Sequence, residues 1–137
     1  MIMNKIVFYL LCIVFACSCK KDRYLFTMKT VTLNKYNKSN FPDQNLFIKV
    51  IDTYQYNVIA KSETNPSTQT LPTTYNVAPH PQIHLYKDGK ITIELWGDST
   101  GYIGSSTINM KEYKIQFPLD METTDGTTTF TVAGTWE

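Results

Sequence analysis

Two histidines, His80 and His84, come nearest to the spacing of a metal site. On one extended strand they would share a face, but four residues at about 3.3 Å each place them roughly 13 Å apart. A zinc ion needs its nitrogen ligands within about 2.1 Å, so a shared metal would require a sharp bend at Pro81. We therefore predict no metal site and no cofactor.

Nucleophilic chemistry has equally little support in the sequence. Serine, threonine and aspartate are plentiful, but there is no nucleophile elbow, no cysteine–histidine pairing and no glycine-rich phosphate loop. We therefore predict no catalytic residues and a protein that is not an enzyme. A hydrolase whose site one sequence does not reveal is a weaker alternative.

Aromatic residues near strand ends are better candidates for binding. Phe41, Trp96 and Tyr102 fall at one predicted end of the fold, and Asp98 lies between the last two. Aromatic rings stack on sugars or contact protein partners, so we take these four residues as candidate ligand-binding residues. The alternative is that the rings cap the core, as aromatic residues of terminal strands commonly do.

Alternation of apolar and polar residues predicts the strands that position these side chains. We expect eight: Tyr24 to Tyr36, Asn45 to Ile51, Asn57 to Ser62, Gln82 to Tyr86, Lys90 to Trp96, Ile103 to Met110, Tyr113 to Leu119 and Thr128 to Trp136. The first changes its buried side near Lys29, which predicts a bulge. With no helical periodicity after the N-terminal segment, the sequence predicts an all-β, eight-stranded antiparallel β-sandwich.

The connections follow from turn residues. Gln82 to Trp96 reads as a hairpin around Asp88-Gly89, and Met121 to Thr127 as a turn. Glu63 to Pro79 reads as a loop with an irregular edge, because Pro72 and Pro79 would keep it out of a central ladder.

Strand reversals then predict which loops meet. One end of the fold should carry Asn37 to Gln44, Glu63 to Pro79 and Gly97 to Gly101. The opposite end should carry Asp52 to Tyr56 and Lys87 to Gly89.

The N-terminus has the pattern of an export signal. Lys5 supplies positive charge and Ile6 to Ala16 is apolar, but this run is only about half of the roughly 20 residues that a spanning helix needs. Without Lys5, twelve basic residues balance twelve acidic ones, which gives little attraction for nucleic acid. We therefore predict an exported protein with no nucleic-acid partner.

All three cysteines lie in or just after this segment, so the folded domain has no disulfide of its own. Val14 to Cys17 and Ala16 to Cys19 both resemble a bacterial lipobox, whose last cysteine is acylated and becomes the mature N-terminus. Cys19, followed by Lys20-Lys21-Asp22, is similar to the start of many Bacteroidota lipoproteins. An ordinary secretory signal with incidental cysteines is the alternative.

This resemblance implies a signal peptide at 1–18, a lipidated tether at 19–23 and one domain at 24–137. Arg23 stands where a second acidic residue accompanies surface display in that group, so periplasmic and surface orientations both stay open. Cys17 is the other candidate for lipidation. Two or more acyl chains hold a protein stably on a bilayer.

The strands from Asn45 to Trp136 resemble a C2 domain, the β-sandwich family that binds calcium and phospholipid. Asn45 to Val50 resembles its Asp-Pro-Tyr-Val-Lys-Val strand, and Tyr102 to Gly104 its Phe-Ile-Gly. The segment Leu71 to Asn76 is loosely similar to its Asn-Pro-x-Trp-Asn-Glu, and Phe130 to Trp136 fits its closing strand.

The residues at the family's calcium-binding positions differ. Asn45, Gly97, Ser99 and Gly101 stand where the family has acidic ligands, and Asp43 and Asp98 are displaced from those positions. Calcium takes six to eight oxygen ligands, several of them carboxylates, so the resemblance implies a domain that does not depend on calcium.

Together these features predict a lipoprotein of the bacterial outer membrane, facing the periplasm or the cell surface. Its bilayer contact is the lipid anchor, and its domain performs non-enzymatic binding or a structural role with an envelope protein. The alternative is a surface glycan-binding accessory protein that uses Phe41, Trp96 and Tyr102.

Overall fold

The computed structural model of this chain describes residues 24–85, 89–113 and 120–137, so Cys17 and Cys19 lie outside the described residues. Within them the chain forms β-strands and two short 3₁₀ turns, Lys38–Asn40 and Met110–Tyr113. The strands are β1 (Leu25–Lys35), β2 (Asn45–Asp52), β3 (Asn57–Ser62), β4 (Asn65–Pro66), β5 (Thr73–Ala78), β6 (Gln82–His84), β7 (Lys90–Gly97), β8 (Gly101–Asn109), β9 (Asp120–Thr124) and β10 (Thr129–Trp136). The predicted all-β fold is confirmed.

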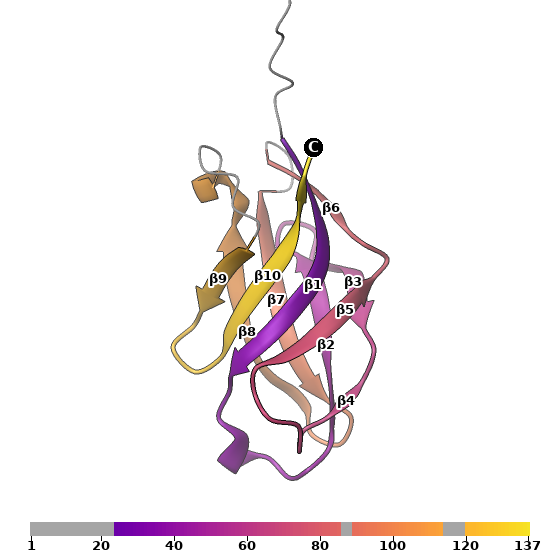
Figure 1. Cartoon of the computed structure of the whole chain (residues 1–137), viewed down its shortest axis with the longest axis vertical. Coiled ribbons are helices and arrows are strands. Elements are labelled where there is room, and N and C mark those ends of the chain that lie inside the picture. The colour runs from indigo at the N-terminus through magenta and orange to yellow at the C-terminus, as the bar shows by residue number, and fades with distance from the viewer. Residues whose placement is uncertain (1–23, 86–88, 114–119) are drawn as a thin grey trace, which may run out of the picture.

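The described strands form one antiparallel sheet that curls round on itself (Figure 1). Its order is β8-β7-β2-β3-β5-β1-β10-β9, with β4 on β2 and β6 on β1. Thr123 Oγ1 donates to the Thr107 carbonyl at 3.0 Å and lies 2.7 Å from Ser106 Oγ, which brings β9 beside β8. The two predicted layers are therefore halves of one sheet that nearly closes into a barrel.

Alternating side chains fill the space inside the sheet. On β1, Phe26 and Met28 are buried, and so are Val31 and Leu33 on the other parity. The register between β1 and β10 shifts between Met28 and Thr30, which is the bulge predicted near Lys29. The core side of β1 thus stays continuous across the bulge.

The predicted hairpin from Gln82 to Trp96 is wrong in its pairing. β6 pairs with Leu25 to Thr27 of β1, whereas β7 pairs with β2 and β8. Alternation reveals the buried side of a strand and not its neighbour, and the eleven residues of β1 have room for β5 and β6 in succession. Asp88 of the predicted turn lies outside the described residues.

The expectation for Glu63 to Pro79 is wrong in its second half. β5 lies there, in the middle of the sheet, and pairs with both β1 and β3. Pro72 precedes this strand and Pro79 follows it, so every residue from Thr73 to Ala78 keeps its backbone N–H for the ladder.

The segment before the last strand also differs from its prediction. β9 occupies Asp120–Thr124, where a turn was expected, and only Met121 of this strand is buried, so alternation was weak. The turn itself is shorter: Asp125 Oδ1 accepts hydrogen bonds from Thr127 N at 2.8 Å and Thr128 N at 2.7 Å. Of the predicted strand Tyr113 to Leu119, Tyr113 lies in a 3₁₀ turn and 114–119 lie outside the described residues.

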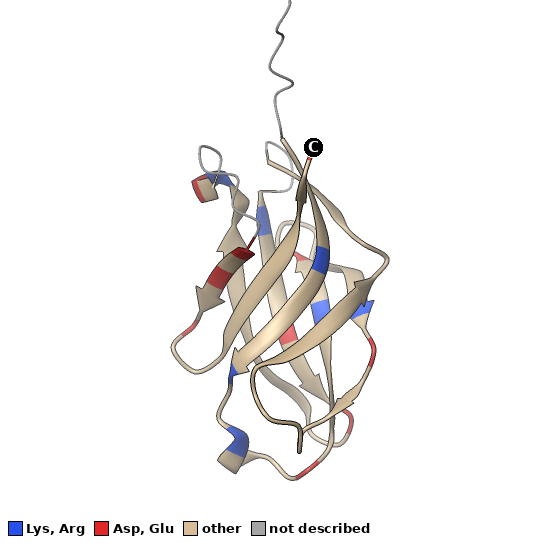
Figure 2. Ribbon diagram, viewed as in Figure 1, with Lys and Arg blue, Asp and Glu red and all other residues tan. Residues whose placement is uncertain are grey.

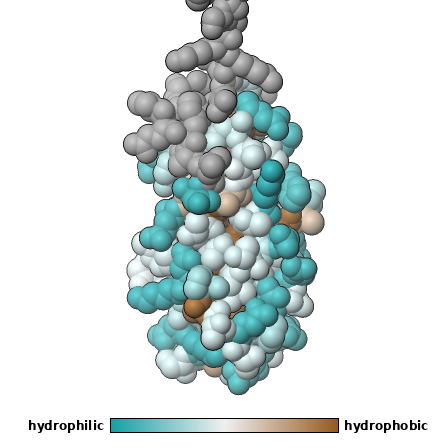
Figure 3. Space-filling model, viewed as in Figure 1, coloured by the Kyte–Doolittle hydropathy of each residue, from teal (hydrophilic) through white to brown (hydrophobic). Residues whose placement is uncertain are grey.

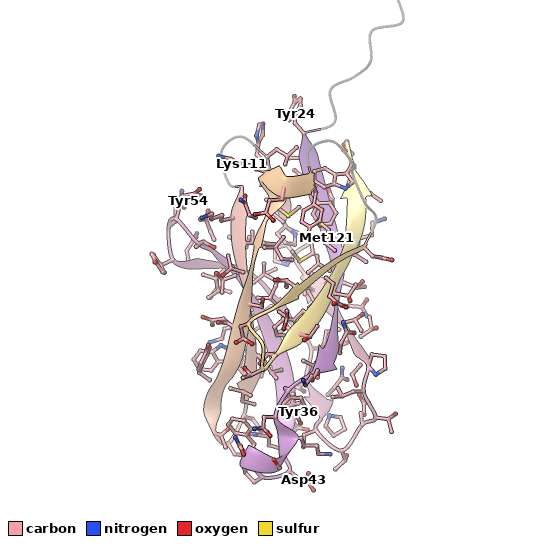
Figure 4. The ribbon with its side chains drawn as sticks, turned by 90° about the vertical axis from the view of Figure 1, so that its left-hand side faces the viewer. Tyr24, Tyr36, Asp43, Tyr54, Lys111 and Met121 are labelled. Atoms are coloured by element: carbon pink, nitrogen blue, oxygen red, sulfur yellow. The ribbon has the colours of Figure 1, made fainter. Side chains whose placement is uncertain are left out.

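The two ends of the molecule carry different segments (Figure 4). Tyr24 lies at one end, and Tyr36 and Asp43 lie at the other. Gln44 accepts hydrogen bonds from Ser99 and Thr100, so the loops after β1 and β7 meet as predicted. We call the end that carries Tyr36 and Asp43 the loop end. Tyr24 N donates to the carbonyl of Glu137 at 3.0 Å, which places both chain ends of the domain at the Tyr24 end.

Candidate functional site

Aromatic rings from three neighbouring strands line up on the outer side of the sheet. Phe47 of β2 lies opposite Trp96 of β7, and Trp96 lies opposite Tyr102 of β8. One step along β2 towards the Tyr24 end, Lys49 lies opposite Lys61 of β3. We call these five residues the aromatic face. They point outward because residues on the other parity of β2 and β7 are buried.

The three rings touch without forming one flat platform. The Phe47 and Trp96 ring centroids are 6.5 Å apart, with planes inclined by 21°. The Tyr102 ring is 5.9 Å from Trp96 and inclined by 78°. Tyr102 therefore stands edge-on beside the indole, and half of its surface is exposed to solvent.

Hydrogen bonds orient two of these rings. Trp96 Nε1 donates to Glu94 Oε2 at 2.7 Å, and the Tyr102 hydroxyl donates to Ser105 Oγ at 2.9 Å. Each ring is therefore held beside a polar group on its own strand. An apolar ring with adjacent hydrogen-bonding groups suits a ligand that has both apolar and hydroxylated faces.

The two lysine ammonium groups lie over the rings. Lys49 Nζ is 3.4 Å from the Trp96 ring centroid and 5.8 Å from that of Phe47, and Lys61 Nζ is 4.3 Å from that of Phe47. Each such cation–π contact contributes about 0.5–1 kcal/mol at an exposed position. A ligand that approaches the rings therefore meets both ammonium groups.

A bulge in β8 brings Tyr102 to Trp96. Leu95 is opposite Gly104 and Trp96 is opposite Tyr102, so Ile103 is the extra residue. Without the bulge, Trp96 would be opposite Ile103. Gly101, at φ 77°, begins this strand, and a Cβ at that position would lie 3.9 Å from the Trp96 ring.

Asp98, a predicted binding residue, braces the loop beside the aromatic face. Its Oδ2 accepts from Asn45 Nδ2 at 2.9 Å, and its Oδ1 accepts from Asn45 N at 3.1 Å and Ser99 Oγ at 3.2 Å. The side-chain hydrogen bond from Asn45 is the main cause that holds the pKa of the Asp98 carboxyl below its usual value. Both carboxylate oxygens are thus engaged with groups of the protein itself.

Gln44 ties the same loop down from the inside. Its buried side-chain oxygen Oε1 accepts from Ser99 N at 3.2 Å, Thr100 N at 3.1 Å and Thr100 Oγ1 at 3.0 Å. A Cβ at Gly97 would overlap this amide, so the close approach of Gln44 requires glycine there. The strand ends that carry Trp96 and Tyr102 are therefore held by buried hydrogen bonds.

Phe41 lies apart from the other predicted binding residues. It packs against the core and lines a cavity of about 220 Å³ together with Ile103 and Thr128. The structure therefore brings Trp96, Tyr102 and Asp98 together at one place and assigns Phe41 to core packing. Trp96 lies in β7 as predicted, and Tyr102 lies in β8, which begins at Gly101 and not at the predicted Ile103.

The other residues considered for metal chemistry lie in separate places. Asp43 Oδ1 accepts from Ser67 Oγ at 3.4 Å, His80 is exposed, and the His84 ring lies 4.9 Å from the Tyr24 ring. Across the described residues, no three His, Cys, Asp or Glu side chains gather closely enough to hold a metal ion.

A second hollow lies between β3 and β6, nearer the Tyr24 end. It has a volume of about 320 Å³, with Ile59, Ile83 and Ile91 among its apolar walls and Asp52 and Asn57 among its polar ones. The Asp52 carboxylate accepts from Tyr54 N at 2.8 Å and Gln55 N at 3.1 Å, so it caps the turn after β2.

Phe47, Lys49 and Lys61 belong to the face but were not among the predicted binding residues. The alternation of β2 contained the signal for two of them, because Phe47 and Lys49 fall on the solvent-facing parity of Asn45 to Ile51. The position of Lys61 over Phe47 depends on strand pairing, which the sequence does not give.

Comparison of the chain with protein-family models, with curated proteins and with solved structures gives no significant match. In the part of the chain that the structure describes, no helix has the length and apolar character to cross a bilayer.

Proposed function

We propose that this chain is a lipid-anchored, non-enzymatic binding module of the bacterial envelope, and that its ligand binds at the aromatic face without calcium. The observation that carries this proposal is the row of Phe47, Trp96 and Tyr102 across three strands. Rings held on a rigid sheet lose little conformational entropy when a ligand binds.

A glycan is the ligand class that suits this face best. A sugar ring has an apolar side that stacks on an aromatic ring and hydroxyl groups that need hydrogen-bond partners. Trp96 with Glu94 and Tyr102 with Ser105 place both kinds of group together.

The position of the face supports a role away from the membrane. An anchor at Cys19 would connect to the domain at Tyr24. The rings lie near the start of β2 and the end of β7, toward the loop end (Figures 1 and 4). The aromatic face would then be far from the bilayer. The outer-membrane address, the lipoprotein signal and the C2-like strand pattern are part of this proposal and rest on sequence resemblance.

Binding is tested by pull-down of the full chain with bacterial and plant polysaccharides. We expect Trp96→Ala and Tyr102→Ala each to weaken retention by about tenfold or more, since truncation of a central aromatic residue costs about 2 kcal/mol. Thr131→Ala, on the outside of β10, is the matched control and should bind like the wild type. Retention that does not change with Trp96→Ala would contradict glycan binding at this face.

The anchor is tested by metabolic labelling with a fatty acid. Cys19→Ser should abolish labelling, and Cys17→Ser should leave it in place. The opposite pattern would assign the anchor to Cys17, and absence of label in the wild type would contradict lipidation. Protease treatment of intact cells then separates the two orientations, because only a surface-displayed domain is cleaved.

Independence from calcium is tested by the thermal midpoint of unfolding. We expect no change in millimolar calcium. Calcium binding at a hundredfold excess over Kd would instead stabilise the fold by about 2.7 kcal/mol, which this measurement would detect. A clear rise of the midpoint would show that calcium binds.

A further inference from the structure

Two lysines of the aromatic face lie opposite each other on neighbouring strands. Lys49 and Lys61 are register partners in β2 and β3, and both ammonium groups lie within 6 Å of the same ring, that of Phe47. Like charges directly opposite each other destabilise a sheet. This arrangement therefore favours an anion that lies between the two side chains.

The neighbouring carboxylates accept hydrogen bonds from other groups of the protein. Glu94, opposite Lys49 on β7, accepts from the Trp96 indole, and Glu63, after β3, accepts from Asn76 Nδ2 at 3.4 Å. Asp98 accepts from Asn45. Among the residues that the structure describes, neither lysine forms an ion pair.

Charge is scattered over the rest of the described surface. Figure 2 shows single basic and acidic positions along the strands, with no broad region of one sign. The pairing of two lysines over aromatic rings is therefore a local feature. It combines two positive groups with the rings of the proposed glycan site.

We propose that the aromatic face binds an acidic glycan, a sugar that carries a carboxylate, sulfate or phosphate. The anionic group lies between Lys49 and Lys61, and the sugar ring packs against Trp96 and Tyr102. This inference rests on the proposed glycan-binding function and narrows its ligand class.

The position of the ammonium groups also discriminates against a neutral glycan. Lys49 lies over Trp96 and Lys61 over Phe47. A neutral sugar that stacks on either ring must displace the ammonium group and offers it no negative charge in return. An acidic sugar offers charge-assisted hydrogen bonds, which are stronger than the exposed cation–π contacts that they replace. The flexible lysine stems allow this movement.

The test is affinity electrophoresis of the full chain in gels that contain polygalacturonate, dextran sulfate or neutral dextran. We expect retardation by an acidic polymer, and about a hundredfold weaker binding when Lys49→Gln and Lys61→Gln are combined, since each hydrogen bond to a charged group contributes about one power of ten in affinity. Salt should weaken the binding of the wild type more than that of this double variant.

Matched variants separate a specific site from general charge attraction. Lys29→Gln combined with Lys35→Gln removes the same charge from β1 and should bind like the wild type. Lys49→Arg combined with Lys61→Arg keeps the charge and should retain most of the binding. The circular dichroism spectrum and thermal midpoint of each variant confirm that it folds.

The outcomes distinguish this inference from the function on which it rests. Equal binding of acidic and neutral polymers, sensitive to Trp96→Ala but not to the Lys49 and Lys61 variants, would overturn the acidic ligand and leave glycan binding in place. An equal loss in the β1 control would overturn it as well. No binding of any polysaccharide would overturn both. Preference for polygalacturonate over dextran sulfate would identify a carboxylate as the anion, and the reverse a sulfate.

Discussion

The two halves of the curled sheet carry different side chains on their outer surfaces. On β1, β5 and β10 four outward-facing residues are Thr32, Asn34, Thr74 and Thr131. We call these four residues the threonine face. Thr32 and Thr74 hydroxyl oxygens lie 2.8 Å apart, and Asn34 Nδ2 donates to Thr131 Oγ1 at 2.7 Å. The threonine face satisfies its own hydrogen-bonding groups, whereas the aromatic face places two cations over rings.

The view onto the threonine face shows a surface without a broad apolar area (Figure 3). Most of it has the pale to hydrophilic colouring expected of threonine, serine and asparagine. Such a surface keeps a β-sheet soluble through small polar groups.

The contrast is also visible along one strand. Toward the Tyr24 end of β7, Thr92 Oγ1 lies 3.1 Å from Thr53 Oγ1 and 3.0 Å from Thr107 Oγ1, as in the threonine face. Trp96 of the aromatic face lies further along that same strand. A threonine row is therefore sufficient to cover this sheet, and the proposed ligand binding would account for the aromatic residues near the loop end.

The largest expected effect compares Gly97, the last residue of β7, with Gly126, in the turn between β9 and β10. Gly97→Ala should lower the free energy of unfolding by about 2–3 kcal/mol, because its Cβ displaces the Gln44 amide and its buried hydrogen bonds. Gly126→Ala, between β9 and β10, meets no atom within 4 Å but keeps φ at 94°, so we expect about 1 kcal/mol. Urea denaturation measures both free energies of unfolding. A loss in Gly97→Ala no larger than that in Gly126→Ala would contradict the role of Gln44.

The next effect concerns alkaline pH and the core beneath the threonine face. Burial, with a smaller contribution from Tyr36, raises the pKa of Tyr75 from 10.0 to about 12. The folded state therefore keeps this proton more tightly than the unfolded state, so stability present below pH 10 is lost as the pH rises from 10 towards 12, by about 1–2 kcal/mol.

The measurement is the urea midpoint of unfolding between pH 9 and 12. Tyr75→Phe cannot ionise at this position, so its stability should fall less steeply over the same range. A wild-type curve no steeper than that of Tyr75→Phe would contradict the raised pKa.

A smaller effect tests the cation over the indole. A double-mutant cycle of Lys49→Met and Trp96→Leu should give a favourable coupling of about 0.5–1 kcal/mol. The cycle of Lys49→Met and Lys61→Met should give an unfavourable coupling of a few tenths of a kcal/mol, because it reports like charges. A favourable coupling between the two lysines would remove the argument for a bound anion.

The smallest effect is expected on the threonine face. Thr74→Ala removes one exposed hydroxyl partner of Thr32 and should change the free energy of unfolding by no more than about 0.5 kcal/mol. Its retention by polysaccharides should equal that of the wild type. A loss of binding comparable to that of Trp96→Ala would mean that the ligand contacts both sides of the sheet.

The sequence predicted correctly those features that depend on the residues of a single strand. The buried parity of β2 and β7 and the bulge near Lys29 follow from alternation within each strand. Pairing depends on contacts between distant segments, so the predicted hairpin of β6 with β7 was wrong and the central position of β5 was missed.

The same limit applies to the candidate site. Trp96 and Tyr102 were found because they are aromatic residues beside a turn, and their contact depends on a bulge at Ile103 that alternation alone does not specify. Phe41 has the same sequence character but packs against the core. Lys61 becomes part of the face only through the register of β3 with β2.

The most direct measurement of the central claim uses the two tryptophans of the chain. In a titration of the ¹⁵N-labelled full chain with an oligogalacturonate, each indole N–H gives one signal in the heteronuclear NMR spectrum. Trp136 is buried against Phe26 at a ring distance of 4.9 Å, away from the aromatic face. We expect the Trp96 signal, assigned with Trp96→Phe, to shift saturably while the Trp136 signal stays in place. A Trp96 signal that does not move, or an equal shift of both signals, would contradict binding of an acidic glycan at the aromatic face.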